Sequence, residues 1–99
     1  MWLLIDDERN LGCDVIARTA EAGKALLAAH KWEGVCLDHD LGCDETGYHV
    51  LNWAIENGHL PSAVQLVTSN PPGRERMGLA LEAAGYEKLS PFDYEKKNP

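Results

Sequence analysis

The stretch Val35–Gly42, which reads Val-Cys-Leu-Asp-His-Asp-Leu-Gly, decides the fold of this chain. Three apolar residues lead directly into a segment that carries two carboxylates, Asp38 and Asp40, and ends in a glycine. A short apolar run is typical of a buried strand, and the polar residues and glycine after it are typical of a loop. In open parallel α/β sheets, ligands bind in the crevice beyond the carboxyl ends of the strands. The stretch therefore predicts a central strand that ends at a functional site.

Two other apolar runs end in polar residues in the same way. Trp2–Ile5 is followed by the acidic pair Asp6–Asp7, and Val64–Val67 is followed by Thr68–Ser69. Since the carboxyl ends of parallel strands share one edge of a sheet, we expect these groups to lie beside Asp38. Clustered carboxylates repel one another, and oxygen ligands of this kind suit a hard cation such as Mg2+ or Mn2+. The pattern predicts a metal site.

Composition limits the classes of protein that need to be considered. The chain has 99 residues and a hydrophobic fraction of 44%, which indicates one domain with one core. Its net charge of −7 argues against nucleic acids and anionic membranes as partners. Acids begin at Asp6, so the start does not read as a signal peptide, and no apolar run has membrane-spanning length. We expect a single domain over residues 1–99 in the cytoplasm.

The order of the predicted elements indicates an α/β fold with a flavodoxin-like, doubly wound parallel sheet of five strands. The gap between the first two strands is too short for a crossover helix, so the first helix is expected to be missing. A helix after the last strand is expected to be missing as well, and the expected strand order is 2-1-3-4-5. The predicted strands are 2–5, 15–19, 35–37, 63–67 and 87–89, the predicted helices are 20–30, 48–56 and 74–84, residues 70–73 are expected to form a rigid turn, and the residues after Phe92 a charged tail.

The two missing helices would cover the same face of such a sheet. That face is therefore expected to be thinly covered, with either Leu3 and Ile5 or Trp2 and Leu4 partly exposed. An apolar surface of this kind usually meets a partner, so we expect a homodimer or protein-partner surface there.

Several motifs resemble those of bacterial response-regulator receiver domains, and the resemblance covers nearly the whole chain. Leu4–Glu8 looks like the acidic opening of receivers, Asp38 falls where their phospho-accepting aspartate ends the third strand, and Thr68 matches their switch hydroxyl. Ala84–Asp93 resembles their last strand and the turn that follows it. Within the superfamily, Asp-Asp-Glu-Arg, Leu-Asp-His-Asp-Leu-Gly, Thr-Gly-Tyr and Ser-Asn-Pro most resemble the divergent cyclic-phosphate-processing branch, which also lacks the first helix.

The chain departs from these relatives at two positions. Ser90 stands where receivers carry the lysine that contacts the phosphoryl group, and Lys88 is the candidate to replace that lysine. In the cyclic-phosphate-processing branch a His-Ser pair ends the fourth strand, whereas this chain has Thr68–Ser69.

The resemblance implies a mechanism for the predicted site. Asp6, Asp7 and Asp38 would hold the metal together with the backbone carbonyl of Asp40, and Asp38 would accept a phosphoryl group from a histidine kinase or a small phosphodonor. Thr68 would donate a hydrogen bond to a phosphoryl oxygen. We also expect metal-free protein to be poorly folded, because the clustered charges oppose a small core.

The sequence is compatible with three functions. The leading one is a single-domain receiver that is phosphorylated on Asp38, with Thr68, Ser69, Asp40 and Lys88 as further site residues. Asp40 would shorten the lifetime of the aspartyl phosphate by orienting water. The second reading is a Mg2+-dependent enzyme that processes cyclic phosphates, and the third is a degenerate receiver that only binds partners.

Overall fold

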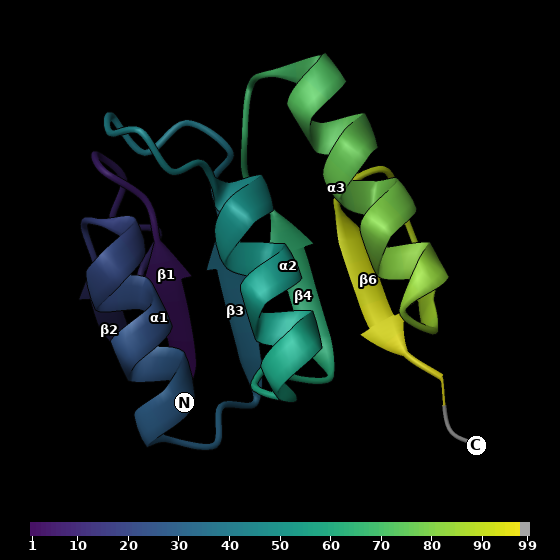
Figure 1. Ribbon diagram of the computed structural model, residues 1–99, viewed down its shortest axis with the longest axis horizontal. Helices are drawn as coiled ribbons and strands as arrows, with labels where there is room; N and C mark the ends of the chain where they lie inside the picture. Colours follow the sequence, from purple (N-terminus) through teal and green to yellow (C-terminus); the bar gives the residue numbers. More distant parts are fainter. Residues whose placement is uncertain (98–99) are drawn as a thin grey trace.

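The computed structural model describes residues 1–97 and shows one mixed sheet with three helices packed against it (Figure 1). The strands are β1 (Trp2–Ile5), β2 (Val15–Ala17), β3 (Gly34–Leu37), β4 (Ala63–Leu66), β5 (Tyr86–Lys88) and β6 (Asp93–Lys96). The helices are α1 (Ala20–Ala29), α2 (Gly47–Asn57) and α3 (Pro71–Ala83).

The sheet has six strands in the order β2-β1-β3-β4-β6-β5. The first four are parallel to their neighbours, as the sequence predicts. The expected charged tail is wrong, because residues 93–96 form β6, which inserts antiparallel between β4 and β5. Tyr94 explains the error: it is the one buried side chain of this strand, so three charged neighbours hide the strand pattern. The α/β, receiver-like fold class is confirmed, with the predicted order altered by this added strand.

All three helices lie on one face of the sheet (Figure 1). The expected absence of a helix after β1 holds in the described chain, as does the absence of one after β5. Right-handed crossovers explain the arrangement, because each helix connects parallel strands in the same direction across the sheet. The core between the sheet and the helices is made mainly of Leu3, Ile5, Val35, Leu37, Val50, Leu51, Val64, Leu66, Met77 and Leu81.

The helix-free face is better covered than the sequence suggests. Trp2 is half-buried, as expected for one of the two alternatives, but Leu4 is fully buried. The connection between β1 and β2 folds against this face and brings Cys13 Sγ to 3.9 Å from Cys36 Sγ. The chain segment that replaces the missing helix therefore does part of that helix's packing.

Local signals set the helix ends. Thr19 caps α1 by accepting a hydrogen bond from the Ala22 backbone N–H at 3.1 Å. The predicted rigid turn at 70–73 is wrong, because α3 already begins at Pro71. Asn70 is its N-cap and accepts from the Gly73 N–H at 3.1 Å. Proline is tolerated in a first helical turn, since its missing N–H would have no partner there.

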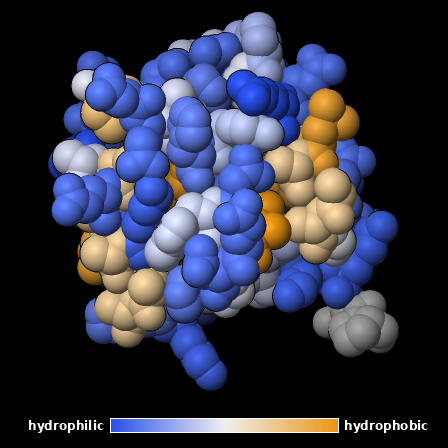
Figure 2. Space-filling view, viewed as in Figure 1, coloured by the Kyte–Doolittle hydropathy of each residue, from blue (hydrophilic) through white to orange (hydrophobic). Residues whose placement is uncertain are grey.

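The face that carries the helices is mostly hydrophilic, with apolar side chains in scattered groups (Figure 2). Within residues 1–97, no helix has the length and apolar character needed to cross a bilayer.

Candidate metal centre

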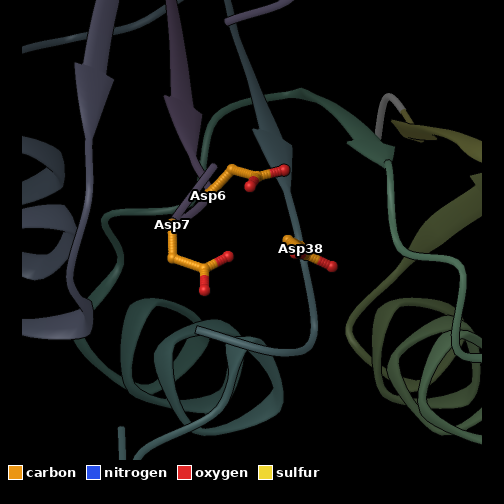
Figure 3. Close-up of side chains that lie close together, drawn as sticks. All are labelled: Asp6, Asp7 and Asp38. Atoms are coloured by element: carbon orange, nitrogen blue, oxygen red, sulfur yellow. The ribbon is translucent and has the colours of Figure 1, made fainter. Parts of the chain in front are cut away.

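Three carboxylates meet at the carboxyl ends of β1 and β3. Asp6, Asp7 and Asp38 each offer one oxygen, and these oxygens lie within 4.8 Å of one another. Figure 3 shows the side chains grouped at the ends of neighbouring strands. Asp6 is fully buried and Asp38 is 6% exposed, whereas Asp7 faces solvent. The strand-end rule thus brings together the three acidic side chains that were predicted as ligands.

Asp6 is fixed by its own loop. Its Oδ1 accepts hydrogen bonds from the backbone N–H groups of Glu8 and Arg9, at 2.9 and 3.0 Å. Its Oδ2 accepts from Arg9 Nη1 at 2.9 Å. Burial raises the pKa of Asp6 more than any single hydrogen bond lowers it, but the hydrogen bonds and the Arg9 charge together leave that pKa below its usual value. Asp6 is therefore held ionised.

Arg9 is a site residue that sequence reasoning missed. Besides its bond to Asp6, Nη1 lies 3.4 Å from Asp38 Oδ2, so one guanidinium bridges the two buried carboxylates. Arg18 supports the loop by donating from Nη1 to the Arg9 carbonyl oxygen at 2.6 Å. The available signal was the Asp-x-x-Arg spacing directly after a strand, because an aspartate there commonly bonds the backbone two or three residues on.

Asp38 sits in a less favourable environment than Asp6. Burial and the neighbouring negative charge of Asp6 raise its pKa, while Thr68, Arg9 and the His39 backbone act to lower it. The net effect is a pKa above the ordinary value, so the ionised carboxylate is costly where it stands. A carboxylate held in this way is well suited to accept a cation or to react.

The hydroxyl pair at the end of β4 is divided between two environments. Thr68 is buried, with its hydroxyl oxygen accepting a hydrogen bond from the Asn70 backbone N–H at 3.0 Å. A hydrogen bond from Thr68 is one of the influences that lower the pKa of Asp38. Ser69, by contrast, is exposed. Of the two predicted hydroxyls, Thr68 is the one placed at the buried carboxylate.

Two glycines allow the helices to approach the central strand closely. A Cβ on Gly47 would lie 1.9 Å from the carbonyl oxygen of Asp38, and the Gly47 N–H donates to the His39 carbonyl oxygen at 2.7 Å. A Cβ on Gly73 would lie 2.6 Å from the His39 ring. The His39 ring therefore packs against the first turn of α3. Gly47, which belongs to the Thr-Gly-Tyr motif, and Gly73 are both needed for this packing.

The remaining predicted residues lie outside the carboxylate cluster. Asp40 is exposed, with its carboxylate 3.1 Å from His39 Nδ1 and 3.5 Å from the Asn70 side-chain amide. Lys88 is exposed at the end of β5, and β6 separates that strand from β4. Ser90 closes the turn between β5 and β6, because its hydroxyl donates to Asp93 Oδ2 at 2.7 Å.

The chemistry of the donor set fits a hard divalent cation. All three candidate ligands are carboxylates, which are preferred by Mg2+ and Mn2+, and the cluster offers no thiolate or imidazole. Asp7 is exposed, so an ion can reach its carboxylate from solvent. The carbonyl of Asp40 remains a predicted fourth ligand.

The matches to known proteins agree with this geometry. None of the curated proteins compared with the chain matches it significantly. The family described as the cyclic-phosphate processing Receiver domain matches residues 1–83, which include the carboxylates, Arg9, Thr68, Gly47 and Gly73. The match supports the resemblance read from the motifs. Because the matched segment spans most of the sequence and all of the cluster, the chain belongs to the cyclic-phosphate processing Receiver domain family.

Proposed function

We propose that this protein is a receiver-like signalling domain that binds Mg2+ and accepts a phosphoryl group on Asp38. The observation that carries the proposal is the grouping of Asp6, Asp7 and Asp38 at the carboxyl edge of the sheet, with Asp38 at the end of the central strand. Membership of a receiver-like family supports the same function.

In the proposed reaction, the carboxylate of Asp38 is the nucleophile. One of its oxygens attacks the phosphorus of a phosphohistidine on a kinase, the P–N bond breaks, and the leaving imidazole nitrogen takes up a proton. With a small acyl phosphate as donor, a P–O bond breaks instead and a carboxylate leaves. Thr68 donates a hydrogen bond to the transferred group, and Asp40 orients the water that later hydrolyses the aspartyl phosphate.

Asp6, Asp7 and Asp38 are the residues that would hold Mg2+, with the Asp40 carbonyl as a further ligand. Bound there, a divalent cation neutralises clustered negative charge and stabilises phosphoryl oxygens. We also propose that binding adds stability to the fold, since a ligand that binds only the folded state stabilises it by about 2.7 kcal/mol at a hundred times its Kd. The helix-free face of the sheet is the proposed surface for a homodimer or a protein partner.

A magnesium titration tests the site directly. Near-ultraviolet circular dichroism and Tm are followed while Mg2+ is added, first alone and then with beryllofluoride, which mimics an aspartyl phosphate. We expect Mg2+ to raise Tm and beryllofluoride to add a saturable spectral change. The Asp38→Asn variant should lose the second response, whereas Asp44→Asn, at an exposed aspartate outside the cluster, should keep both. If neither the spectrum nor Tm changes when Mg2+ is added, the proposed metal site is contradicted.

Phosphorylation needs its own measurement. Intact-mass spectrometry after incubation with acetyl phosphate and Mg2+ should show the added mass of one phosphoryl group, and Asp38→Asn should not gain it. An Asp40→Asn variant should hold the group longer if Asp40 orients the hydrolytic water. If wild-type protein binds Mg2+ but gains no phosphoryl group, phosphorylation is ruled out, and the domain is a degenerate receiver that acts by binding partners.

A second candidate function is the Mg2+-dependent opening of cyclic phosphates, which is favoured by the description of the matching family. The reaction would add water across one P–O ester bond, giving a phosphomonoester and a free hydroxyl. Thr68–Ser69 stand where the family branch is expected to carry His-Ser, so the chain lacks that histidine at the end of β4. Incubation with a 2′,3′-cyclic nucleotide and Mg2+ separates the two functions, since only a cyclic-phosphate-processing enzyme would hydrolyse the nucleotide.

A further inference from the structure

The charge balance around Asp38 depends on one positive side chain. Among residues 1–97, Arg9 is the only cationic side chain in contact with Asp38. Lys88 lies on β5, beyond the intervening strand β6. Ser90, at the position of the receiver lysine, is uncharged and is engaged in the β5–β6 turn.

The other arginines near this edge of the sheet are engaged elsewhere. The guanidinium of Arg74 lies over the Phe92 ring, 4.7 Å from its centroid, and that of Arg76 lies over the Tyr48 ring at 4.0 Å. Arg18 donates to Asn10 and to backbone carbonyl oxygens of the β1–β2 loop. These contacts leave Arg9 as the cation that faces the reacting carboxylate.

We propose that Arg9 is the phosphoryl-binding residue of this site, taking over the task that a lysine performs in ordinary receivers. The inference rests on the proposed function, because it concerns the group carried by Asp38. In the structure the guanidinium bridges Asp6 and Asp38. When Asp38 carries a phosphoryl group, the guanidinium turns its hydrogen bonds onto the phosphoryl oxygens, and the Mg2+ ligands are released from their internal cation.

The position of Arg9 suits this exchange. Its backbone is anchored, since its N–H donates to Asp6 Oδ1 and its carbonyl accepts from Arg18. Its side chain is 37% exposed, so the guanidinium can turn without leaving a cavity in the core. Its hydrogen bond to Asp6 and its ion pair with Asp38 both use Nη1, so Nε and Nη2 can donate to a ligand. A guanidinium presents paired donors that match phosphoryl oxygens.

The same geometry gives Arg9 opposite effects on the two ligands. A cation that already neutralises Asp6 and Asp38 competes with Mg2+ for these carboxylates. A cation beside Asp38 attracts the additional negative charge of a phosphoryl group. Removing the guanidinium should therefore strengthen Mg2+ binding while weakening the binding of a phosphoryl mimic. Misfolding, or a purely structural role, would weaken both.

The experiment compares Arg9→Gln with wild type and with the matched control Arg76→Gln, in which the altered arginine is exposed and stacks on Tyr48. Isothermal titration gives the Kd for Mg2+ alone, and then the Kd for beryllofluoride at saturating Mg2+. For Arg9→Gln we expect Mg2+ affinity to rise severalfold and beryllofluoride affinity to fall by about tenfold or more, the size expected for losing a hydrogen bond between charged groups. Arg76→Gln should match wild type in both.

The possible results separate this inference from the proposed function. If wild type binds Mg2+ but not beryllofluoride, the proposed function fails, and this inference with it. If wild type binds beryllofluoride and Arg9→Gln binds it equally well, the inference alone is overturned.

A measurement on wild-type protein covers the case in which Arg9→Gln does not fold. The guanidinium 15N signals are recorded by NMR at saturating Mg2+ before and after beryllofluoride, with the Arg9 signal assigned from an Arg9→Lys spectrum. We expect this signal to shift and its hydrogens to exchange more slowly on binding. An unchanged Arg9 signal in protein that binds beryllofluoride would overturn the proposal.

Discussion

Replacing Gly47 with alanine should destabilise the protein, although the same change in an ordinary helix stabilises it. Gly47 is the first residue of α2, and a Cβ there would meet the Asp38 carbonyl oxygen at 1.9 Å. That oxygen belongs to the backbone at the end of the central strand, so it cannot turn aside as a side chain could. The helix and the strand must separate, which also strains the hydrogen bond from the Gly47 N–H to the His39 carbonyl oxygen.

The magnitude follows from two opposed contributions. Alanine in place of glycine ordinarily adds about 0.4–1 kcal/mol by restricting the unfolded chain. Forcing an extra methyl group into a packed site costs about 1–3 kcal/mol, and a distorted hydrogen bond costs about 1 kcal/mol more. With a contact of 1.9 Å the high end applies, so we expect a net loss of about 3 kcal/mol. In a domain of this size that lowers Tm by roughly 12–24 °C.

Urea unfolding followed by far-ultraviolet circular dichroism measures this loss, and Mg2+ titration shows whether it reaches Asp38. Gly58→Ala is the matched control, because Gly58 has a φ of +71° but nothing within 4 Å of its Cβ position. It should lose about 1–2 kcal/mol from left-handed strain and keep its Mg2+ affinity. Gly47→Ala should lose both stability and Mg2+ affinity. Wild-type stability or wild-type Mg2+ affinity in Gly47→Ala would refute the reasoning.

Two further predictions concern ionisable groups. Because burial and the charge of Asp6 raise the pKa of Asp38, its ionised form lowers stability above that pKa. At neutral pH and in the presence of chelator, Asp38→Asn should therefore have a higher Tm than wild type. This difference in Tm should shrink in acid, and a difference that stays the same would contradict the prediction. Tyr86 is buried, donates to the Pro61 carbonyl oxygen at 2.7 Å, and has its pKa raised to about 12. The stability contributed by the protonated Tyr86 hydroxyl is complete below its unfolded pKa of about 10 and is lost as pH rises towards 12. The urea midpoint of wild type should therefore fall at alkaline pH, and that of Tyr86→Phe should fall less. Equal falls in the two proteins would argue against this role.

The strand-end rule explains why much of the site could be predicted from the sequence. Asp6, Asp38 and Thr68 each follow an apolar run directly, and parallel pairing alone brings such positions together. No side-chain contact has to be known for that step. The missing first helix was predictable on similar grounds, since chain length limits what a connection can contain.

Arg9 and Gly47 could not be placed in the same way. The contact between Arg9 and Asp38 depends on how a loop folds back, and the need for Gly47 depends on how closely α2 approaches β3. Both are distances between segments, which periodicity does not encode. The strand at residues 93–96 could not be predicted for another reason: Tyr94 is its one buried side chain, and the other three are charged, so there is little apolar pattern to recognise.

The placement of β6 has a consequence for the order in which the protein is made. The residues that pair with β4 come about thirty positions later in the chain, as the register of Ala63 with Glu95 shows. At translation rates of about 5–20 residues per second, roughly two to six seconds separate the two strands. During that time β4 has an unpaired edge that another chain can join. Ribosome pausing between α3 and β6 would lengthen this window, and a chain cut before Asp93 would never close it.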